Sequence, residues 1–95
     1  MNIYEVDFTF FIESGNENSV ATKDKLLDML NSIKMVEVYD VYDDDEDWCI
    51  DCIAEVKAES ADKVDTAMNK LLEGIDIIWD YHYIKGIDND EYWES

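Results

Sequence analysis

The stretch YEVDFTFFI, residues 4–12, constrains the fold most, because its apolar side chains recur at every second position. Only a β-strand turns a two-residue repeat into one continuous face. One face of this strand collects Tyr4, Val6, Phe8, Phe10 and Ile12, and the other carries Glu5, Asp7, Thr9 and Phe11. We therefore predict a strand with one face buried and the other carrying carboxylates.

Two segments have the apolar spacing of helices. In SVATKDKLLDMLNSI, residues 19–33, Leu26 and Leu30 belong to an apolar stripe whose members lie three or four positions apart. A second stripe runs through ADKVDTAMNKLLEG, residues 61–74. Ser60 is placed as an N-cap and Gly74 as a C′ glycine, so both ends of this helix are marked.

Three more segments are strand-like: KMVEVYDVY at 34–42, DWCIDCIAEVKA at 47–58 and DIIWDYHYI at 76–84. The resulting order, β-α-β-β-α-β, is typical of the ferredoxin-like fold. We predict a single α+β domain over residues 1–95. It would be a four-stranded antiparallel sheet of strand order 4-1-3-2 with two helices on one face. An acidic tail at about residues 88–95 would follow the last strand.

The charge balance restricts the partners of this domain. Twenty-five Asp and Glu residues face seven lysines and no arginine, which gives a formal net charge of −18 at pH 7. Such a charge disfavours direct binding to nucleic acid, phosphate-rich substrates or anionic membranes. Because 47% of the residues are hydrophobic, the chain is expected to fold rather than to form a disordered acidic tail. We expect a basic partner.

The predicted partner-binding residues are carboxylates in three groups. With the helices on one face of the sheet, one group lies on the other face, and Asp80 belongs to it if Trp79, Tyr81 and Tyr83 point to the helices. The groups are Glu5, Asp7, Glu37, Asp51, Glu55 and Asp80 on the sheet; Asp40, Asp43, Asp44, Asp45, Glu46 and Asp47 around the hairpin; and Asp88, Asp90 and Glu91 in the tail. Tyr92 and Trp93 would either fold back onto the sheet or anchor a partner.

The hairpin acids also have to be weighed as a calcium loop, which needs glycine at position 6 and glutamate at position 12. Counted from Asp40, these positions hold Asp45 and Asp51, and counted from Asp43 they hold Trp48 and Ala54. The match is poor. We predict no dedicated metal site, and the remaining alternatives are a solvated loop or part of a surface for a basic partner.

Nothing in the sequence has the spacing of a catalytic or cofactor site. The CIDC motif lies in a predicted strand, where Cys49 and Cys52 point to opposite faces and are too far apart for a disulfide. His82 is the one histidine and has no evident catalytic companions. We predict neither enzymatic activity nor a cofactor. Two cysteines and an N-terminus without a signal-peptide pattern favour the cytoplasm.

The acidic runs YDDDEDW and DNDEYWE, together with the outward Glu5, Asp7, Glu37, Asp51, Glu55 and Asp80, resemble those of small acidic nucleic-acid mimics. Phages and mobile elements make such proteins, among them anti-CRISPR and anti-restriction proteins. The resemblance implies an inhibitor, present in the cytoplasm of a bacterial host, that occupies the nucleic-acid-binding groove of a defence complex or another basic protein.

Two other functions fit the same sequence. One is a small non-enzymatic interaction or regulatory domain, monomeric or homodimeric, that binds a basic partner through a sheet edge or face. The other is a divalent-cation binder. Reduced partner binding by a folded variant with neutralised acids would favour the mimic, whereas a calcium-dependent rise in melting temperature would favour the cation binder.

Overall fold

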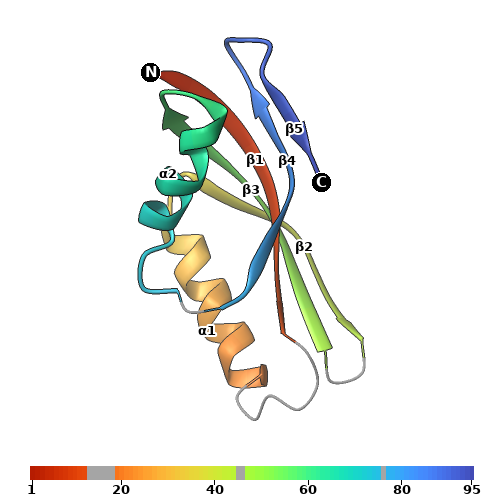
Figure 1. Cartoon of the computed structure of the whole chain (residues 1–95). Helices are drawn as coiled ribbons and strands as arrows, with labels where there is room; N and C mark the ends of the chain where they lie inside the picture. Colours follow the sequence, from red (N-terminus) through yellow and green to blue (C-terminus); the bar gives the residue numbers. More distant parts are fainter. Residues whose placement is uncertain (13–18, 45–46, 76) are drawn as a thin grey trace.

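The computed structural model describes residues 1–12, 19–44, 47–75 and 77–95. Its elements are β1 (Asn2–Ile12), α1 (Ser19–Ser32), β2 (Val36–Asp44), β3 (Asp47–Ala58), the 3-10 helix η1 (Ala61–Lys63), α2 (Val64–Leu71), β4 (Trp79–Gly86) and β5 (Tyr92–Glu94). Both α-helices lie on one face of a twisted sheet, and the β2–β3 hairpin and the β4–β5 turn lie at opposite ends (Figure 1). The principal extents are 41 × 24 × 19 Å.

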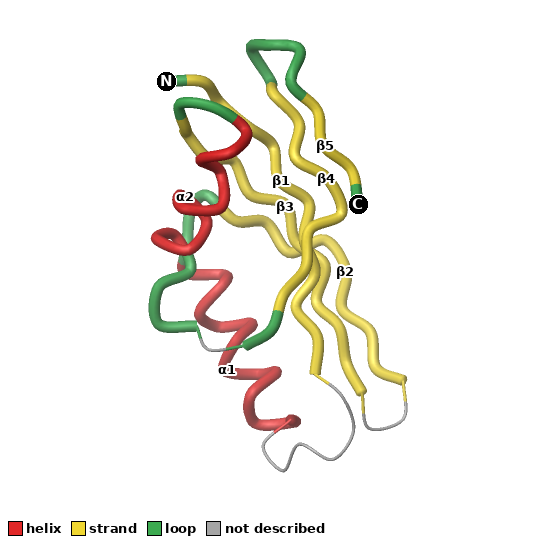
Figure 2. Tube along the Cα trace, viewed as in Figure 1, coloured by secondary structure: helices red, strands yellow, loops and turns green. Residues whose placement is uncertain are grey.

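The five strands form one antiparallel sheet in the order β2-β3-β1-β4-β5, drawn as the yellow tube in Figure 2. The prediction of a four-stranded sheet of order 4-1-3-2 is therefore wrong, because a fifth strand, β5, lies beside β4 and extends the order to 2-3-1-4-5. The end of the acidic tail forms β5, which pairs with β4 through Tyr83↔Glu94 and Lys85↔Tyr92. Without β5, β4 would be an edge strand with a row of unpaired backbone groups, so pairing the tail satisfies them.

The core lies between the helices and the sheet. Tyr4, Val6, Phe8 and Phe10 are fully buried, which confirms the alternation predicted for β1 at these positions; the side chain of Ile12 falls outside the described residues. The other fully buried large side chains come from both helices and from β3: Leu26, Leu30, Val64, Met68, Ile50 and Cys52. Trp79 extends this core, because its ring packs edge-on against Phe8 at a centroid distance of 5.7 Å.

The helices begin and end close to the predicted positions, with one change at the second. A 3-10 turn, η1, precedes α2, and Ser60 makes no side-chain capping bond to it. The carboxylate of Glu91 accepts a hydrogen bond from Ala61 N–H instead, at 2.9 Å. Gly74, in the turn after α2, has a φ of +90°, a left-handed conformation that favours glycine.

Two β-bulges decide which side chains reach each face of the sheet. In β2 the register with β3 shifts between Val38 and Asp40, so Tyr39 is the extra residue. In β4 the partners of Asp7 and Phe8 are Tyr83 and Tyr81, so His82 is the extra residue. A bulge inserts one residue and reverses the alternation beyond it. Tyr83 consequently faces away from the helices, and its predicted inward orientation is wrong.

The β4–β5 turn attaches the C-terminal end of the chain to the N-terminal strand. Gly86 lies so close to Asn89 that an added Cβ would overlap Asn89 Oδ1. Asn89 Oδ1 accepts the N–H of Glu91, and Glu91 O accepts the N–H of Gly86. Ile87 N–H donates to Ile3 O, which joins the turn to β1. Among the described helices, none has the length and apolar character needed to cross a membrane.

Candidate partner-binding surface

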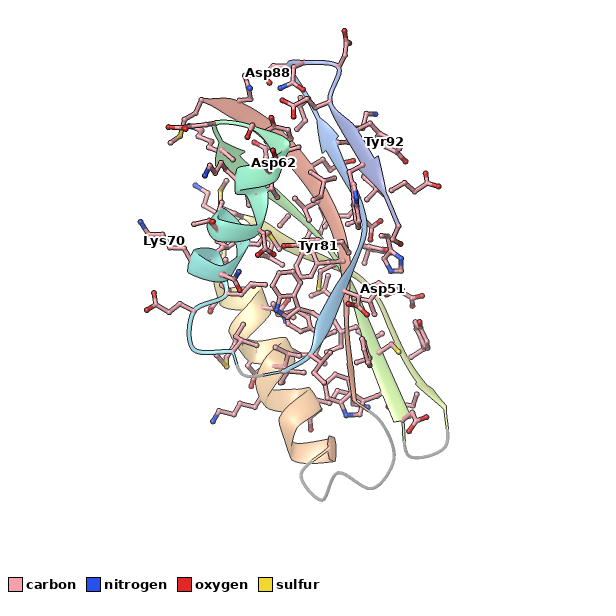
Figure 3. The ribbon with its side chains drawn as sticks, in the orientation of Figure 1. Asp51, Asp62, Lys70, Tyr81, Asp88 and Tyr92 are labelled. Atoms are coloured by element: carbon pink, nitrogen blue, oxygen red, sulfur yellow. The ribbon has the colours of Figure 1, made fainter. Side chains whose placement is uncertain are left out.

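The face of the sheet opposite the helices, called the open face below, carries carboxylates from all five strands. They include Glu5 and Asp7 of β1, Glu37 and Asp40 of β2, Asp51 and Glu55 of β3, Asp80 of β4 and Glu94 of β5. Lys57 and Lys85 are the lysines that the described strands place on the same face. Figure 3 shows Asp51 and Tyr92 on this side of the sheet, and Asp62 and Lys70 projecting from the helical layer.

Strand pairing places some of these carboxylates directly opposite one another. Glu5 pairs with Glu55, and Asp40 pairs with Asp51. The Cβ atoms of such partners are about 4.5–5.5 Å apart, and like charges there are destabilising. Folding therefore concentrates negative charge on the open face in spite of an electrostatic cost.

Tyrosine hydroxyls hold three of the open-face carboxylates in place. Tyr39 O–H donates to Asp7 Oδ1 at 2.8 Å, and Tyr83 O–H donates to Glu5 Oε2 at 2.8 Å. On β5, the hydroxyl of Tyr92 donates to Glu94 Oε2 at 2.7 Å, while its ring stacks on that of Tyr83 at 6.2 Å. The acids are thus interleaved with aromatic rings, and each hydrogen bond restricts the rotamers of one carboxylate.

These tyrosines stay protonated because a phenolate beside a carboxylate is unfavourable. The hydrogen bond to Glu5, together with burial, raises the pKa of Tyr83 to about 12. Burial and the hydrogen bond to Asp7 also raise the pKa of Tyr39, and the bond to Glu94 raises that of Tyr92. At neutral pH the phenols are therefore hydrogen-bond donors, and the negative charge stays on the carboxylates.

A chain of hydrogen bonds crosses the centre of the open face. Thr9 Oγ1 lies 2.5 Å from Asp51 Oδ1 and 2.5 Å from His82 Nε2, and Thr9 is only 8% exposed. An ionised carboxylate can only accept, so the hydroxyl donates to Asp51, and His82 Nε2–H donates to the hydroxyl. In a catalytic triad the imidazole takes the proton of the hydroxyl and the carboxylate orients the imidazole. Here the carboxylate contacts the hydroxyl instead, so the three groups link β3, β1 and β4.

The hairpin acids do not form a single cluster. Asp43 points to the helix side of the sheet, where both carboxylate oxygens lie within 2.9 Å of Lys23 Nζ on α1. Asp44 and Asp47 are paired across the end of the hairpin. Asp45 and Glu46 lie outside the described residues. Asp43 therefore has a local electrostatic partner.

The predicted tail acids Asp88, Asp90 and Glu91 lie in the β4–β5 turn, at the other end of the molecule (Figure 3). Asp88 accepts the N–H of Ile3, and Glu91 accepts both the hydroxyl of Tyr4 at 2.7 Å and the N–H of Ala61. These two bonds, first from Tyr4 and then from Ala61, hold the pKa of Glu91 below its usual range. Two of the three tail acids thus join the turn to the rest of the domain.

The cysteines lie as the alternation of β3 predicted. Cys52 is buried in the core and Cys49 is half-buried on the open face, and both are free. Burial raises the pKa of the Cys52 thiol to about 12. Within the described ranges, no group of three or more His, Cys, Asp or Glu side chains is arranged to hold a metal ion.

Sequence reasoning misplaced or missed several residues of the open face for two reasons. Asp40 was predicted as a hairpin acid, but the bulge at Tyr39 turns it onto the open face, and the bulge at His82 turns Tyr83 and Lys85 outward. Glu94 was missed because β5 was taken as a tail. Strict alternation was the only available signal, and it gives no position for an extra residue.

Comparison of the chain with protein-family models, with curated proteins and with solved structures found no match.

Proposed function

We propose that this protein is a non-enzymatic inhibitor that imitates nucleic acid and occupies the phosphate-binding groove of a basic protein. The observation that carries the proposal is the open face, where at least eight carboxylates from five strands accompany the two lysines that the described strands place there. In this proposal the carboxylates pair with lysine and arginine side chains that otherwise hold phosphates. The expected site of action is the cytoplasm of a bacterial host, with an anti-CRISPR or anti-restriction target.

The dimensions and charge of the protein support this proposal. Two outward residues on one strand, such as Glu5 and Asp7, are separated by roughly 7 Å, and adjacent strands by roughly 5 Å. Negative charge therefore recurs at short intervals in two directions. A duplex as long as the 41 Å extent of the protein carries about 24 charges at ~1.7 Å per charge, which is comparable with the net −18 of this chain.

The tyrosines of the open face support the proposal in a second way. A charged side chain that is free to rotate loses conformational entropy when it binds. Tyr39 and Tyr83 already hold Asp7 and Glu5 in the folded protein, so part of this conformational entropy is lost on folding rather than on binding. The exposed ring of Tyr92 adds an aromatic contact of the kind enriched at protein interfaces.

A capture experiment with two matched variants tests the proposal. The open-face variant carries Glu37→Gln, Asp40→Asn, Glu55→Gln and Asp80→Asn, which change exposed acids. The control carries Asp24→Asn, Asp28→Asn, Asp62→Asn and Glu73→Gln, which are exposed acids of the helical layer and the turn after α2. Both variants lose four negative charges, so they differ only in which surface is neutralised.

The immobilised wild-type protein is expected to capture a nucleic-acid-binding protein from bacterial lysate and to release it when salt or competing DNA or RNA is added. At about 0.5 kcal/mol for each lost ion pair, the open-face variant should bind the captured protein at least about thirtyfold more weakly. The control should bind like the wild type. Equal binding by both variants, or a partner indifferent to nucleic acid, would favour an ordinary interaction domain instead.

A further inference from the structure

The strand β3 extends beyond its neighbour β2 and leaves a short free edge. β3 runs from Asp47 to Ala58, but β2 begins at Val36, which pairs with Ala54. One further hydrogen bond joins β3 to the residue that precedes β2, from Glu55 N–H to Met35 O at 3.2 Å. Beyond it, no described strand covers this edge, while β1 pairs with the opposite side of β3 as far as Ala58.

The hydrogen-bonding direction of Glu55 shows which backbone groups face the free edge. Its N–H points toward β2, and backbone groups of a strand alternate in direction from residue to residue. The N–H and C=O of Lys57 therefore point toward the same edge, whereas those of Val56 point toward β1. Lys57 is an exposed residue, and the strand pairings give it a partner on β1, Ile3, but none on the β2 side, which leaves this edge open to an added strand.

A cavity flanks this edge on each face of the sheet. On the helix side, a cavity of about 400 Å³ is lined by Met35, Val56, Ala67 and Leu71, together with Glu55, Lys57 and Lys70. On the open face, a cavity of about 320 Å³ is lined by three carboxylates and Lys34 together with apolar residues: Glu5, Glu37, Glu55, Met35, Val36, Ile53 and Ala54. The first cavity is mainly apolar. The second, called the acidic cavity below, combines apolar side chains with three carboxylates and one lysine.

We propose that the free edge of β3 binds an extended peptide segment of a basic partner as an added strand. The peptide runs antiparallel to β3, continues the line of β2, and exchanges hydrogen bonds with the backbone of Lys57. Successive side chains of a strand point to opposite faces. One side chain of the peptide is therefore apolar and enters the helix-side cavity, and the next is arginine or lysine and enters the acidic cavity.

The two cavities select this occupant over other extended chains. Main-chain bonds give an added strand its affinity, and pockets for alternate side chains give it specificity. In the acidic cavity three carboxylates outnumber one lysine, so a positively charged side chain of the peptide is favoured there. This inference concerns the edge of the sheet and does not rest on the nucleic-acid mimicry proposed for the open face.

The test uses a capped hexapeptide that alternates leucine and arginine, and a control peptide in which three leucines precede three arginines. Fluorescence anisotropy measures binding to the wild type and to two variants at position 57. Lys57→Pro removes the N–H at the free edge, whereas Lys57→Ala keeps it, and both variants remove the same charge. Proline is tolerated on edge strands when its nitrogen faces away from the ladder.

We expect the alternating peptide to bind the wild type and Lys57→Ala alike, and Lys57→Pro at least about tenfold more weakly, since a hydrogen bond is lost and the ring blocks approach. The control peptide should bind the wild type at least about tenfold more weakly than the alternating one does. Equal affinity for the two variants, or for the two peptides, would overturn the proposal, because charge attraction alone would then explain the binding.

A second measurement on the wild type keeps the test decisive if Lys57→Pro does not fold. The amide of Lys57 should exchange rapidly with solvent in the free protein and at least about tenfold more slowly with saturating alternating peptide. The amide of Val56, which faces β1, should change little. If the peptide left the exchange rate of the Lys57 amide unchanged, this result would contradict the proposal. So would protection of this amide in a dimer without peptide, because the occupant would then be a second copy of the chain.

Discussion

Neutralising one member of the Glu5/Glu55 pair is expected to stabilise the protein. The two residues lie directly opposite on β1 and β3. Because the backbone of Glu55 faces β2, this is a non-hydrogen-bonded pair, whose Cα atoms are only about 4.5 Å apart. Two unit charges about 6 Å apart in a water-like dielectric repel by about 0.7 kcal/mol. Lys85, opposite Glu5 on β4, offsets part of this repulsion.

Glu55→Gln should therefore raise the free energy of unfolding by about 0.5 kcal/mol at low salt, within the range measured for cross-strand pairs. For a domain of this size, the gain corresponds to a rise of about 2–4 °C in melting temperature. Urea unfolding and thermal melts at 10 mM and 1 M NaCl measure it. At 1 M the Debye length is about 3 Å, so most of the gain should disappear.

Asp62→Asn is the matched control, because it also removes one exposed negative charge. Asp62 lies in the first turn of η1, where a negative charge is favourable, so this change should leave stability unchanged or slightly lower. A similar gain from both variants would attribute the effect to net charge alone. If Glu55→Gln gives no gain at low salt, the argument that the open face is electrostatically costly is refuted.

Three further substitutions test other contacts. Hydrogen bonds hold the pKa of Glu91 below its usual range, so its stabilising contribution is present above the pKa of the unfolded carboxyl and is lost as pH falls through the folded value; Glu91→Gln should lose less stability than the wild type between pH 6 and pH 3 in urea titrations. Gly86→Ala should cost about 1–3 kcal/mol in thermal melts, because its Cβ meets Asn89, and an unchanged melting temperature would refute this close approach. Thr9→Val should cost about 1–2 kcal/mol in urea unfolding, since Asp51 loses its hydroxyl donor, and a change below about 0.3 kcal/mol would contradict it.

The sequence alone predicted those elements whose apolar residues recur at regular spacing. The buried positions of β1, the two helices and the inward Cys52 all follow from regular spacing, because burial of one face requires that spacing. The two helices on one face of the sheet were also predicted correctly. The number of strands was not predicted correctly, because β5 (Tyr92–Glu94) is only three residues long and forms by pairing with the free edge of β4.

The candidate site was predictable in composition but not in detail. Outward carboxylates of β1 and β3 were predicted from alternation, and two of them, Glu5 and Glu55, lie directly opposite each other. The bulges at Tyr39 and His82 depend on how strands fit the twist of the whole sheet, so local spacing could not locate them. The internal roles of Asp43 and Glu91 were equally hidden, since each depends on a residue distant in sequence.

The central claim is that the open face takes the place of nucleic acid on a basic partner, and a competition titration tests it most directly. The captured partner is loaded with fluorescently labelled duplex DNA or RNA and titrated with the wild-type protein at fixed salt. The account predicts mutually exclusive binding, so the apparent dissociation constant of the nucleic acid should rise in proportion to the protein concentration. A stable ternary complex, with nucleic acid retained at saturating protein, would contradict it.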